Sequence, residues 1–307
     1  MKTIIMKKKL LAHMLAFFSV IVWGSTFIST KILLMSLGPY QILLYRCFIA
    51  WIILWICHFK RASAISLKNE AFYLLASLFG VTLYFICENT ALTYTYSSNA
   101  SLIVTTAPLL SIIFSSIFTS EKNFSKYKMT GALMSMAGVT LVITNGIFNI
   151  RLHPQGDFLA LLAAIFWALF PILLNIIKDD NDIIVRTRKI FFYSIFSIVI
   201  FMLLTQHKFY NSNVITPLNI TNILFLGIIA SALCYIFWGY SVTIINASST
   251  MMYMYLVPIS TLILGKFILD EKITLLMFIG ACFIIIGVYI GNNKQQNNTH
   301  KIKDYCK

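Results

Sequence analysis

Three ionisable residues interrupt long apolar stretches of the chain: Lys31, Arg46 and Glu88. On insertion scales, a single charge at the centre of a membrane-spanning helix costs about 2.5–3.5 kcal/mol, so such residues usually bind a ligand or one another. Two cations and one carboxylate leave a net positive charge, and an arginine can bind a carboxylate through two parallel hydrogen bonds. The three residues therefore predict a binding site for an anionic group of a small molecule.

Each of these residues also has another interpretation. Lys31 could extend its ammonium group to the membrane surface. Arg46 and Glu88 could form a structural ion pair, because neither charge is stable alone in an apolar interior. Glu88 could instead carry a proton, as acidic residues within membrane spans do in many transporters. The sequence leaves these alternatives open.

Long apolar segments must position these side chains. The chain has 307 residues, of which 59% are hydrophobic and only 11% are charged, whereas a soluble globule carries roughly 25% charged residues. About 20 apolar residues suffice for an α-helix to cross a bilayer. We predict an all-α integral membrane protein with ten transmembrane helices, at residues 10–34, 40–58, 71–91, 97–118, 128–148, 157–177, 188–205, 221–242, 248–268 and 274–291.

The distribution of lysine and arginine predicts the orientation of these helices. With a cytoplasmic N-terminus, 18 of the 24 basic residues fall in cytoplasmic connections and tails, and 4 fall in external loops. Such a bias is typical of membrane proteins. It predicts a multi-pass protein of the cell membrane with both termini in the cytoplasm. The same bias accounts for the net charge of +14 without a nucleic-acid partner.

Two prolines indicate an internal duplication. Pro108 and Pro258 each lie thirteen residues before a Glu-Lys pair, and they are 150 residues apart. Trp23 aligns with Trp167 in the same way, at an offset of 144. Each copy contains five predicted spans, so the two copies should be inverted relative to one another, as in many secondary transporters. The predicted units are an N-terminal segment (1–9), a first repeat (10–148), a second repeat (157–291) and a disordered cytoplasmic tail (292–307).

Glycines support the same alignment. Gly131 and Gly138 match Gly280 and Gly287 at an offset of 149. Glycines seven residues apart lie on one face of a helix and let a neighbouring helix approach closely. The last helix of each repeat should therefore pack tightly through this face.

The prolines also predict the depth of a cavity. Each lies about eleven residues into its segment, or roughly 16 Å along a helix, which is close to the middle of a hydrocarbon core about 30 Å thick. A proline there bends the helix and frees a backbone carbonyl, and hydroxyls such as that of Thr105 can compensate nearby. A packing kink without ligand contact is the alternative.

Several uncharged residues are further candidates for the cavity wall. Trp23 and Trp167 lie near the predicted midplane, where they would form an aromatic wall or simply pack helices together. Asn99 and Tyr253 are weaker candidates. Tyr235, by contrast, is predicted to anchor its helix at the membrane interface.

The order of these motifs resembles the EamA family of the drug/metabolite transporter superfamily. The resemblance rests on both repeats, above all on "ENTALTYTYSSNASLIVTTAPLLSIIFSSIFTSEK" at 88–122 and "WGYSVTIINASSTMMYMYLVPISTLILGKFILDEK" at 238–272. It implies a ten-helix transporter that alternates access around a central cavity. The first four helices of each repeat would line that cavity, and the fifth would be peripheral.

We therefore predict a secondary transporter of small metabolites or drugs, exporting amino acids, amines or related compounds. The chain has no glycine-rich phosphate loop and no His/Asp/Glu cluster, so no cofactor, metal or catalytic residue is expected. An integral-membrane enzyme and a non-transporting scaffold are the alternatives. The expected partners are a small-molecule substrate, the lipid bilayer, protons or a counter-substrate, and a second copy of the chain.

Overall fold

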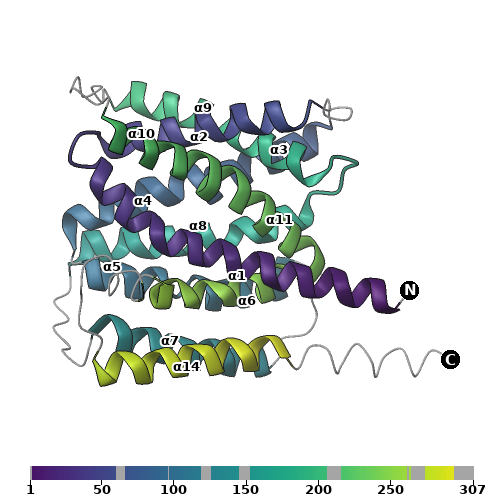
Figure 1. The fold of residues 1–307 in the computed structure, drawn as a ribbon, viewed down its shortest axis with the longest axis vertical. Helices are drawn as coiled ribbons and strands as arrows, with labels where there is room; N and C mark the ends of the chain where they lie inside the picture. Colours follow the sequence, from purple (N-terminus) through teal and green to yellow (C-terminus); the bar gives the residue numbers. More distant parts are fainter. Residues whose placement is uncertain are drawn as a thin grey trace.

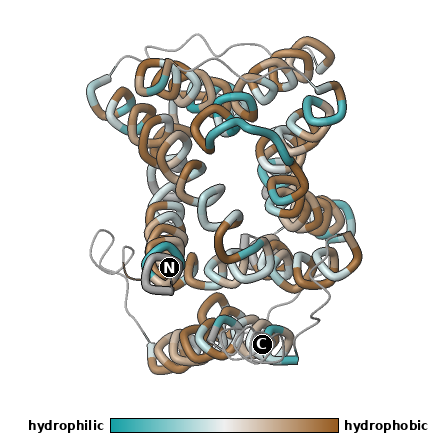
Figure 2. Tube along the Cα trace, turned by 90° about the vertical axis from the view of Figure 1, so that its right-hand side faces the viewer, coloured by the Kyte–Doolittle hydropathy of each residue, from teal (hydrophilic) through white to brown (hydrophobic). Residues whose placement is uncertain are grey.

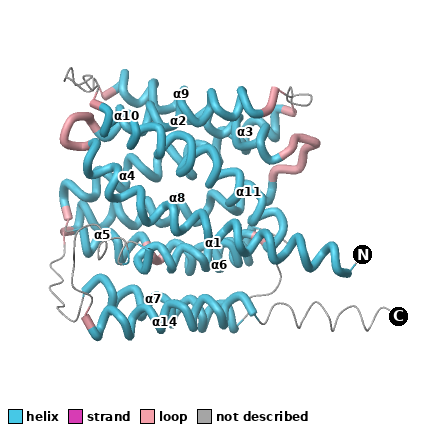
Figure 3. Tube along the Cα trace, viewed as in Figure 1, coloured by secondary structure: helices cyan, strands magenta, loops and turns pink. Residues whose placement is uncertain are grey.

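The protein is a bundle of helices that run side by side (Figures 1 and 3). The computed structural model describes residues 2–59, 66–95, 97–118, 126–144, 153–205, 216–260, 263 and 274–293, and within these ranges it contains no strand. The elements up to residue 148 are α1 (Lys2–Leu33), α2 (Pro39–Cys57), α3 (Leu67–Ser77), η1 (Leu78–Thr82), α4 (Leu83–Tyr94), α5 (Ser97–Val104), α6 (Ala107–Phe118) and α7 (Lys126–Thr144). Those that follow are α8 (Pro154–Ile176), α9 (Ile183–Leu204), α10 (Pro217–Leu224), η2 (Phe225–Leu233), α11 (Cys234–Ile245), α12 (Ala247–Met251), η3 (Met252–Leu256) and α14 (Leu275–Asn293).

Many of these helices are long and apolar enough to cross a membrane. Within the described residues seven such spans occur, and Leu102–Phe118 is a shorter apolar helix. They make the chain a multi-pass membrane protein. Figure 2 looks along the bundle and shows hydrophobic residues over most of the helices. The seven spans are Met6–Thr26, Pro39–Cys57, Leu67–Ala91, Pro154–Ile176, Ile183–Leu204, Pro217–Ile245 and Leu275–Asn292.

Some predicted boundaries differ from the observed ones. Helix α1 begins at Lys2, so most of the predicted N-terminal segment 1–9 is helical. The span predicted at 97–118 is divided between α5 and α6. Most of the predicted tail, residues 294–307, lies outside the described residues, as do both Glu-Lys pairs.

Both prolines follow an irregular stretch of helix. In the first half of the chain (residues 10–148), the helix is interrupted at Thr105 and Thr106, directly before α6 with Pro108. The Thr105 hydroxyl donates to the carbonyl of Leu102 at 2.7 Å, which satisfies a carbonyl at the end of α5. In the second half (residues 157–291), the tighter 3₁₀ helix η3 ends two residues before Pro258.

Helices α7 and α14 form a pair that lies apart from the other helices in both views (Figures 1 and 2). Their backbones touch at glycines: a Cβ on Gly138 would lie 2.5 Å from the carbonyl oxygen of Gly280, and Gly131 faces Gly287 in the same way. No side chain fits at such distances, which explains the glycines. The pair is peripheral, since neither helix lines the cavity described below.

Two helices contain a π-helical segment, in which the hydrogen-bond pattern widens by one residue. The first, η1, joins α3 to α4, and the second, η2, joins α10 to α11. At the 150-residue offset between the two prolines, residues 78–82 of η1 correspond to residues 228–232, which lie within η2. Such segments often mark functional sites. In this chain both lie next to the cavity.

A charged cluster lies at the end of the bundle where α8 connects to α9. Asp179 accepts hydrogen bonds from Tyr73 Oη at 2.7 Å and from Arg186 Nε at 3.0 Å, and Lys189 pairs with Glu70. Burial alone would raise the pKa of the Asp179 carboxyl. The hydrogen bonds and the Arg186 charge outweigh it and hold that pKa below its usual value. Asp179 and Glu70 are thus each paired with a cation of the protein itself.

Candidate functional site

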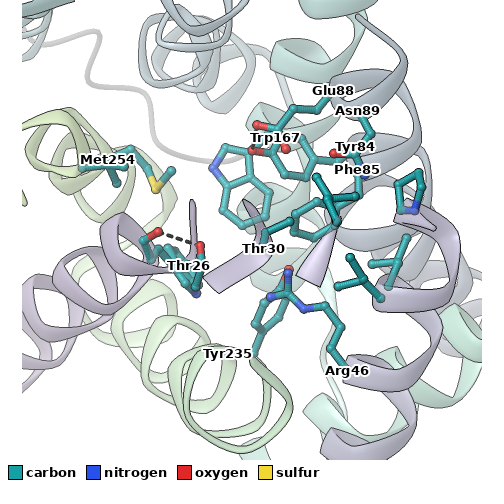
Figure 4. A pocket seen from close by; sticks show the side chains of 16 residues that line it. Thr26, Thr30, Arg46, Tyr84, Phe85, Glu88, Asn89, Trp167, Tyr235 and Met254 are labelled. Carbon is teal, nitrogen blue, oxygen red and sulfur yellow. Dashed lines mark hydrogen bonds between the residues drawn. The ribbon is translucent and has the colours of Figure 1, made fainter. Parts of the chain in front are cut away.

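A cavity of about 410 Å³ lies between helices of the two halves (Figure 4). Its volume is in the range that suits small organic ligands. It extends from the middle of α1 to Leu34 and Pro39 at the turn between α1 and α2. Its lining comprises Trp23, Thr26, Thr30, Leu34, Pro39, Ile42, Leu43, Arg46, Tyr84, Phe85, Glu88, Asn89, Trp167, Tyr235, Met254 and Val257.

Arg46 is the cation among the described residues that line this cavity. It lies on α2, is only 7% exposed, and donates from Nε to Ser231 Oγ at 2.9 Å. Its guanidinium carbon lies 4.8 Å from the centroid of the Phe85 ring, close enough for a cation–π contact. The two terminal nitrogens form no hydrogen bond with any described residue. A buried arginine with free donors facing a cavity suits a ligand with hydrogen-bond acceptors.

Glu88 is the acidic group of the same cavity. Its Oε1 accepts a hydrogen bond of 2.9 Å from Tyr84 Oη, one turn earlier on α4. Within the described residues, Glu88 and Arg46 form no ion pair with each other. Figure 4 shows Glu88 with Asn89 on one side of the cavity and Arg46 beside Tyr235 on another. The two charges are therefore available to different groups of one ligand.

Aromatic rings form much of the wall between these charges. Trp23 and Trp167, from α1 and α8, meet edge to face with their centroids 5.6 Å apart. Tyr84 lies 4.9 Å from Trp167, and Tyr235 lies 5.8 Å from Trp23. Such contacts keep large rings in fixed orientations. The wall suits an apolar or aromatic part of a ligand.

The π-helical segments hold two of these rings. Trp23 Nε1 donates to the carbonyl of Ala230 in η2 at 2.9 Å, and Tyr235 Oη donates to the carbonyl of Gly80 in η1 at 3.0 Å. Gly80 and Ala230 are 150 residues apart, the offset between the two prolines. Each half thus supplies a π-helical carbonyl that fixes an aromatic ring of the other half.

The profile of the EamA-like transporter family matches residues 10–144 and 154–292. The chain belongs to the EamA-like transporter family. It is therefore a membrane transporter that moves a small molecule across a lipid bilayer.

Relatives of this EamA-like transporter carry compatible names. An "Uncharacterized transporter" of Archaeoglobus fulgidus is 29% identical over 290 residues, covering 92% of this chain and 98% of the relative. The "Uncharacterized transporter YyaM" of Bacillus subtilis is 29% identical over 230 residues, covering 72% of each protein. A solved crystal structure with 16% identity has a TM-score of 0.74 and covers 91% of this chain and 95% of its own. At that identity, the likeness concerns the fold alone.

The cavity brings together four of the residues predicted as substrate-binding: Trp23, Arg46, Glu88 and Trp167. The side chains of Lys31 and Asn99 lie outside the described part of the structure. The remaining predicted residues, Thr105 and Tyr253, have other surroundings, as do the two prolines.

Thr105 and Tyr253 do not line the cavity. Thr105 caps the end of α5 through its bond to Leu102. Tyr253 turns toward α1, where its hydroxyl lies 2.8 Å from His13 Nδ1. Its neighbour Met254 lines the cavity instead, because successive residues of a helix point in different directions.

Two important residues of this EamA-like transporter were not predicted from the sequence. Tyr235 was predicted at the membrane interface but is buried in the cavity wall, where its hydroxyl donates a hydrogen bond to the carbonyl oxygen of Gly80. Ser231, which accepts from Arg46, drew no prediction at all, since a single serine in an apolar helix carries no signal of its own. Among the described residues, no cluster of His, Cys, Asp and Glu has the arrangement of a metal site.

Proposed function

We propose that this protein is a secondary transporter whose substrate carries an anionic group bound by Arg46. The observation that carries the proposal is the pair of unbonded terminal nitrogens of Arg46 at the cavity. Leaving a buried guanidinium with unsatisfied donors is costly unless a ligand or water supplies the missing acceptors. A carboxylate, like a phosphate, accepts two parallel N–H hydrogen bonds from one guanidinium.

The rest of the cavity suggests the remainder of the substrate. The aromatic wall around Trp23 and Trp167 favours an apolar or aromatic body. Glu88 favours an amino group, or it exchanges a proton during the transport cycle. These features support amino acids, amines and related compounds as the substrate class, with Trp23, Trp167, Arg46 and Glu88 as binding residues. Lys31, Asn99, Thr105 and Tyr253 remain candidates for another state of the transport cycle.

The membrane arrangement forms part of the same proposal. Ten spans in two inverted repeats, with both termini in the cytoplasm of a bacterial cell, agree with the lysine and arginine bias. In that orientation, the turn between α1 and α2 lies outside the cell, and the cavity, which reaches Leu34 and Pro39 at this turn, extends toward the outer surface. Export would then proceed by alternating access, with Pro108 and Pro258 bending the helices that move. A gradient of protons or counter-substrate would supply the energy.

Transport by purified protein in sealed vesicles tests this proposal. Three radiolabelled probes share one aromatic body: L-phenylalanine has both charges, 3-phenylpropanoate only the carboxylate, and phenethylamine only the amine. We expect uptake of L-phenylalanine without any nucleotide. Arg46→Lys keeps the charge but lacks the planar fork, and should lower uptake of the two carboxylate probes per folded protein by about tenfold or more.

A matched control comes from a second buried arginine. Arg188 is 4% exposed and lies outside the cavity, bonded to the carbonyl of His58 and stacked on Trp55. Arg188→Lys should alter the yield of folded protein but not the uptake per folded protein. If Arg46→Met combined with Glu88→Gln folds and transports L-phenylalanine normally, then Arg46 is a structural residue and the proposal is wrong.

A further inference from the structure

Helix α2 packs unusually closely on the π-helical segment η2. A Cβ on Gly227 would lie 2.6 Å from Cγ2 of Ile49 and 3.4 Å from the carbonyl oxygen of Arg46. Ser231, four residues further along η2, is fully buried, and its hydroxyl accepts the hydrogen bond from Arg46 Nε. The glycine therefore brings α2 near enough for the serine to reach the guanidinium.

A related contact between the two halves is built differently. There, α9 packs on η1 and on Ser77, the last residue of α3, and we call this the α9–η1 contact. Two pairs of hydroxyls form hydrogen bonds with one another: Ser77 with Ser194 at 2.9 Å, and Thr82 with Ser197 at 2.7 Å. At the 150-residue offset, Gly227 corresponds to Ser77 and Ser231 corresponds to Val81. The two repeats therefore differ at position 231, whose serine contacts Arg46.

The bond to Ser231 determines which part of Arg46 remains for a ligand. A guanidinium offers five N–H donors in a rigid plane. Ser231 occupies Nε, and Phe85 covers one face of the plane at 4.8 Å. What remains is the outer edge with the two terminal nitrogens, which can hold both oxygens of a carboxylate.

We propose that Ser231 is a positioning residue that fixes the orientation of Arg46 and thereby the orientation in which an anionic substrate group binds. The inference rests on the proposed function of the cavity. A serine suits this role because its hydroxyl is neutral: it accepts the hydrogen bond but leaves the positive charge of Arg46 uncompensated. A carboxylate at the same position would neutralise the cation that the substrate needs.

The test compares variants of Ser231 in sealed vesicles with L-phenylalanine as the transported probe. Ser231→Ala should raise the KM about tenfold, because a hydrogen bond to a charged group is lost, and should change the maximal rate by less than about twofold. Ser231→Thr keeps the hydroxyl and should restore the KM. Ser231→Cys keeps the shape with a weak acceptor, and replaces Ser231→Ala if that variant does not fold.

Inhibition by the two single-charge probes separates positioning from general damage. For Ser231→Ala, we expect the inhibition constant of 3-phenylpropanoate to rise about as much as the KM, and that of phenethylamine to stay unchanged. Ser194→Ala removes an equally buried serine from the α9–η1 contact, and should leave all three constants unchanged.

Each of the other outcomes overturns the inference. Equal changes for both inhibitors, or a lower maximal rate with an unchanged KM, would assign Ser231 a purely structural role. If Ser231→Ala leaves the KM and both inhibition constants unchanged while Arg46→Lys lowers uptake, the positioning role is rejected and the proposed function stands. If the unmodified protein neither transports nor binds any of the three probes, the proposed function fails, and the role of Ser231 is rejected with it.

Discussion

The α2–η2 and α9–η1 contacts join the same kinds of element, but their chemistry is opposite. In the α9–η1 contact, neutral hydroxyls pair with one another. In the α2–η2 contact, a charged guanidinium pairs with a single hydroxyl and keeps its terminal nitrogens unbonded within the described structure. The hydroxyls of the α9–η1 contact have hydrogen-bond partners within the protein. The terminal nitrogens of Arg46 in the α2–η2 contact are left for a ligand.

Under the proposed function, the substrate binds where the two contacts differ. The shared features, such as the tight α7–α14 pair and the two π-helical carbonyls, build a common frame. The charges of the Asp179 cluster are neutralised by their protein neighbours. Arg46 and Glu88, in contrast, are charges that face a cavity rather than each other. In the proposed function, these shared features form the frame, and positions that differ between the contacts, such as Arg46 and Ser231, bind or orient the substrate.

We expect the largest loss of stability and transport when a residue of the α2–η2 contact is replaced by its counterpart from the α9–η1 contact. Gly227→Ser installs the residue of the other contact, and its Cβ would meet the Ile49 side chain at 2.6 Å. We expect a loss of about 1–3 kcal/mol in the free energy of unfolding, typical of overpacking. Transport should fall as well, because α2 must move and carries Arg46 with it. Chemical denaturation in detergent and vesicle uptake measure the two effects.

The reverse exchange is the control for this prediction. Ser77→Gly removes a hydroxyl and a Cβ from the α9–η1 contact without creating any clash. It should lower stability by about 1 kcal/mol and leave the KM unchanged. An equal loss of transport in both exchanges would show that the two contacts contribute alike, and would contradict the comparison.

A loss of stability of similar size, but without displacement of a helix, is expected when a π-helical carbonyl loses its partner. Tyr235→Phe removes the hydroxyl that donates to Gly80 and leaves a buried acceptor unpaired, at a cost of about 1–3 kcal/mol. Tyr255 provides the matched control, since its buried hydroxyl has no hydrogen-bond partner among the described residues. Tyr255→Phe should therefore be neutral or stabilising. Thermal unfolding of the purified variants distinguishes these results.

Removing both partners of a hydroxyl pair should matter less still. Ser77→Ala together with Ser194→Ala leaves no unpaired group behind from their mutual hydrogen bond. We expect less than about 1 kcal/mol of destabilisation and normal uptake of L-phenylalanine. A strong transport defect in this double variant would mean that the α9–η1 contact takes part in substrate handling.

The least effect on transport is expected from the Asp179 cluster. Because folding lowers the pKa of Asp179, its contribution to stability is complete above its usual pKa, near 3.8, and is lost as the pH falls through the lower value of the folded state. Acidification below about pH 4 should therefore lower the unfolding temperature of the natural protein more than that of Asp179→Asn. At neutral pH, the same variant should be less stable but should keep its KM.

Much of the frame could be predicted from sequence because length and hydropathy determine where helices cross a membrane. Arg46, Glu88, Trp23 and Trp167 were predicted as substrate-binding residues because of their type and their position within the spans, and all four line the cavity. The position of a residue along its helix does not determine which side chains it contacts. That depends also on the rotation of each helix about its axis, which a few polar or charged residues in an apolar sequence do not determine.

The differences between the predicted and the observed contacts follow from this unknown helix rotation. The sequence left an ion pair between Arg46 and Glu88 open as an alternative, whereas Arg46 donates to Ser231 and Glu88 accepts from Tyr84. Tyr253 turns away from the cavity for the same reason. The π-helical segments η1 and η2 were not predicted either, because no residue pattern in the sequence distinguished them from the α-helix around them.

A crystal structure of the protein with bound L-phenylalanine tests the central claim most directly. We predict both carboxylate oxygens within about 3 Å of the two terminal nitrogens of Arg46, with the aromatic ring against Trp23 or Trp167. The bond between Arg46 Nε and Ser231 should persist in the complex. A ligand in the cavity whose carboxylate faces away from Arg46, or an Arg46 that turns to Glu88 when the ligand binds, would contradict the account.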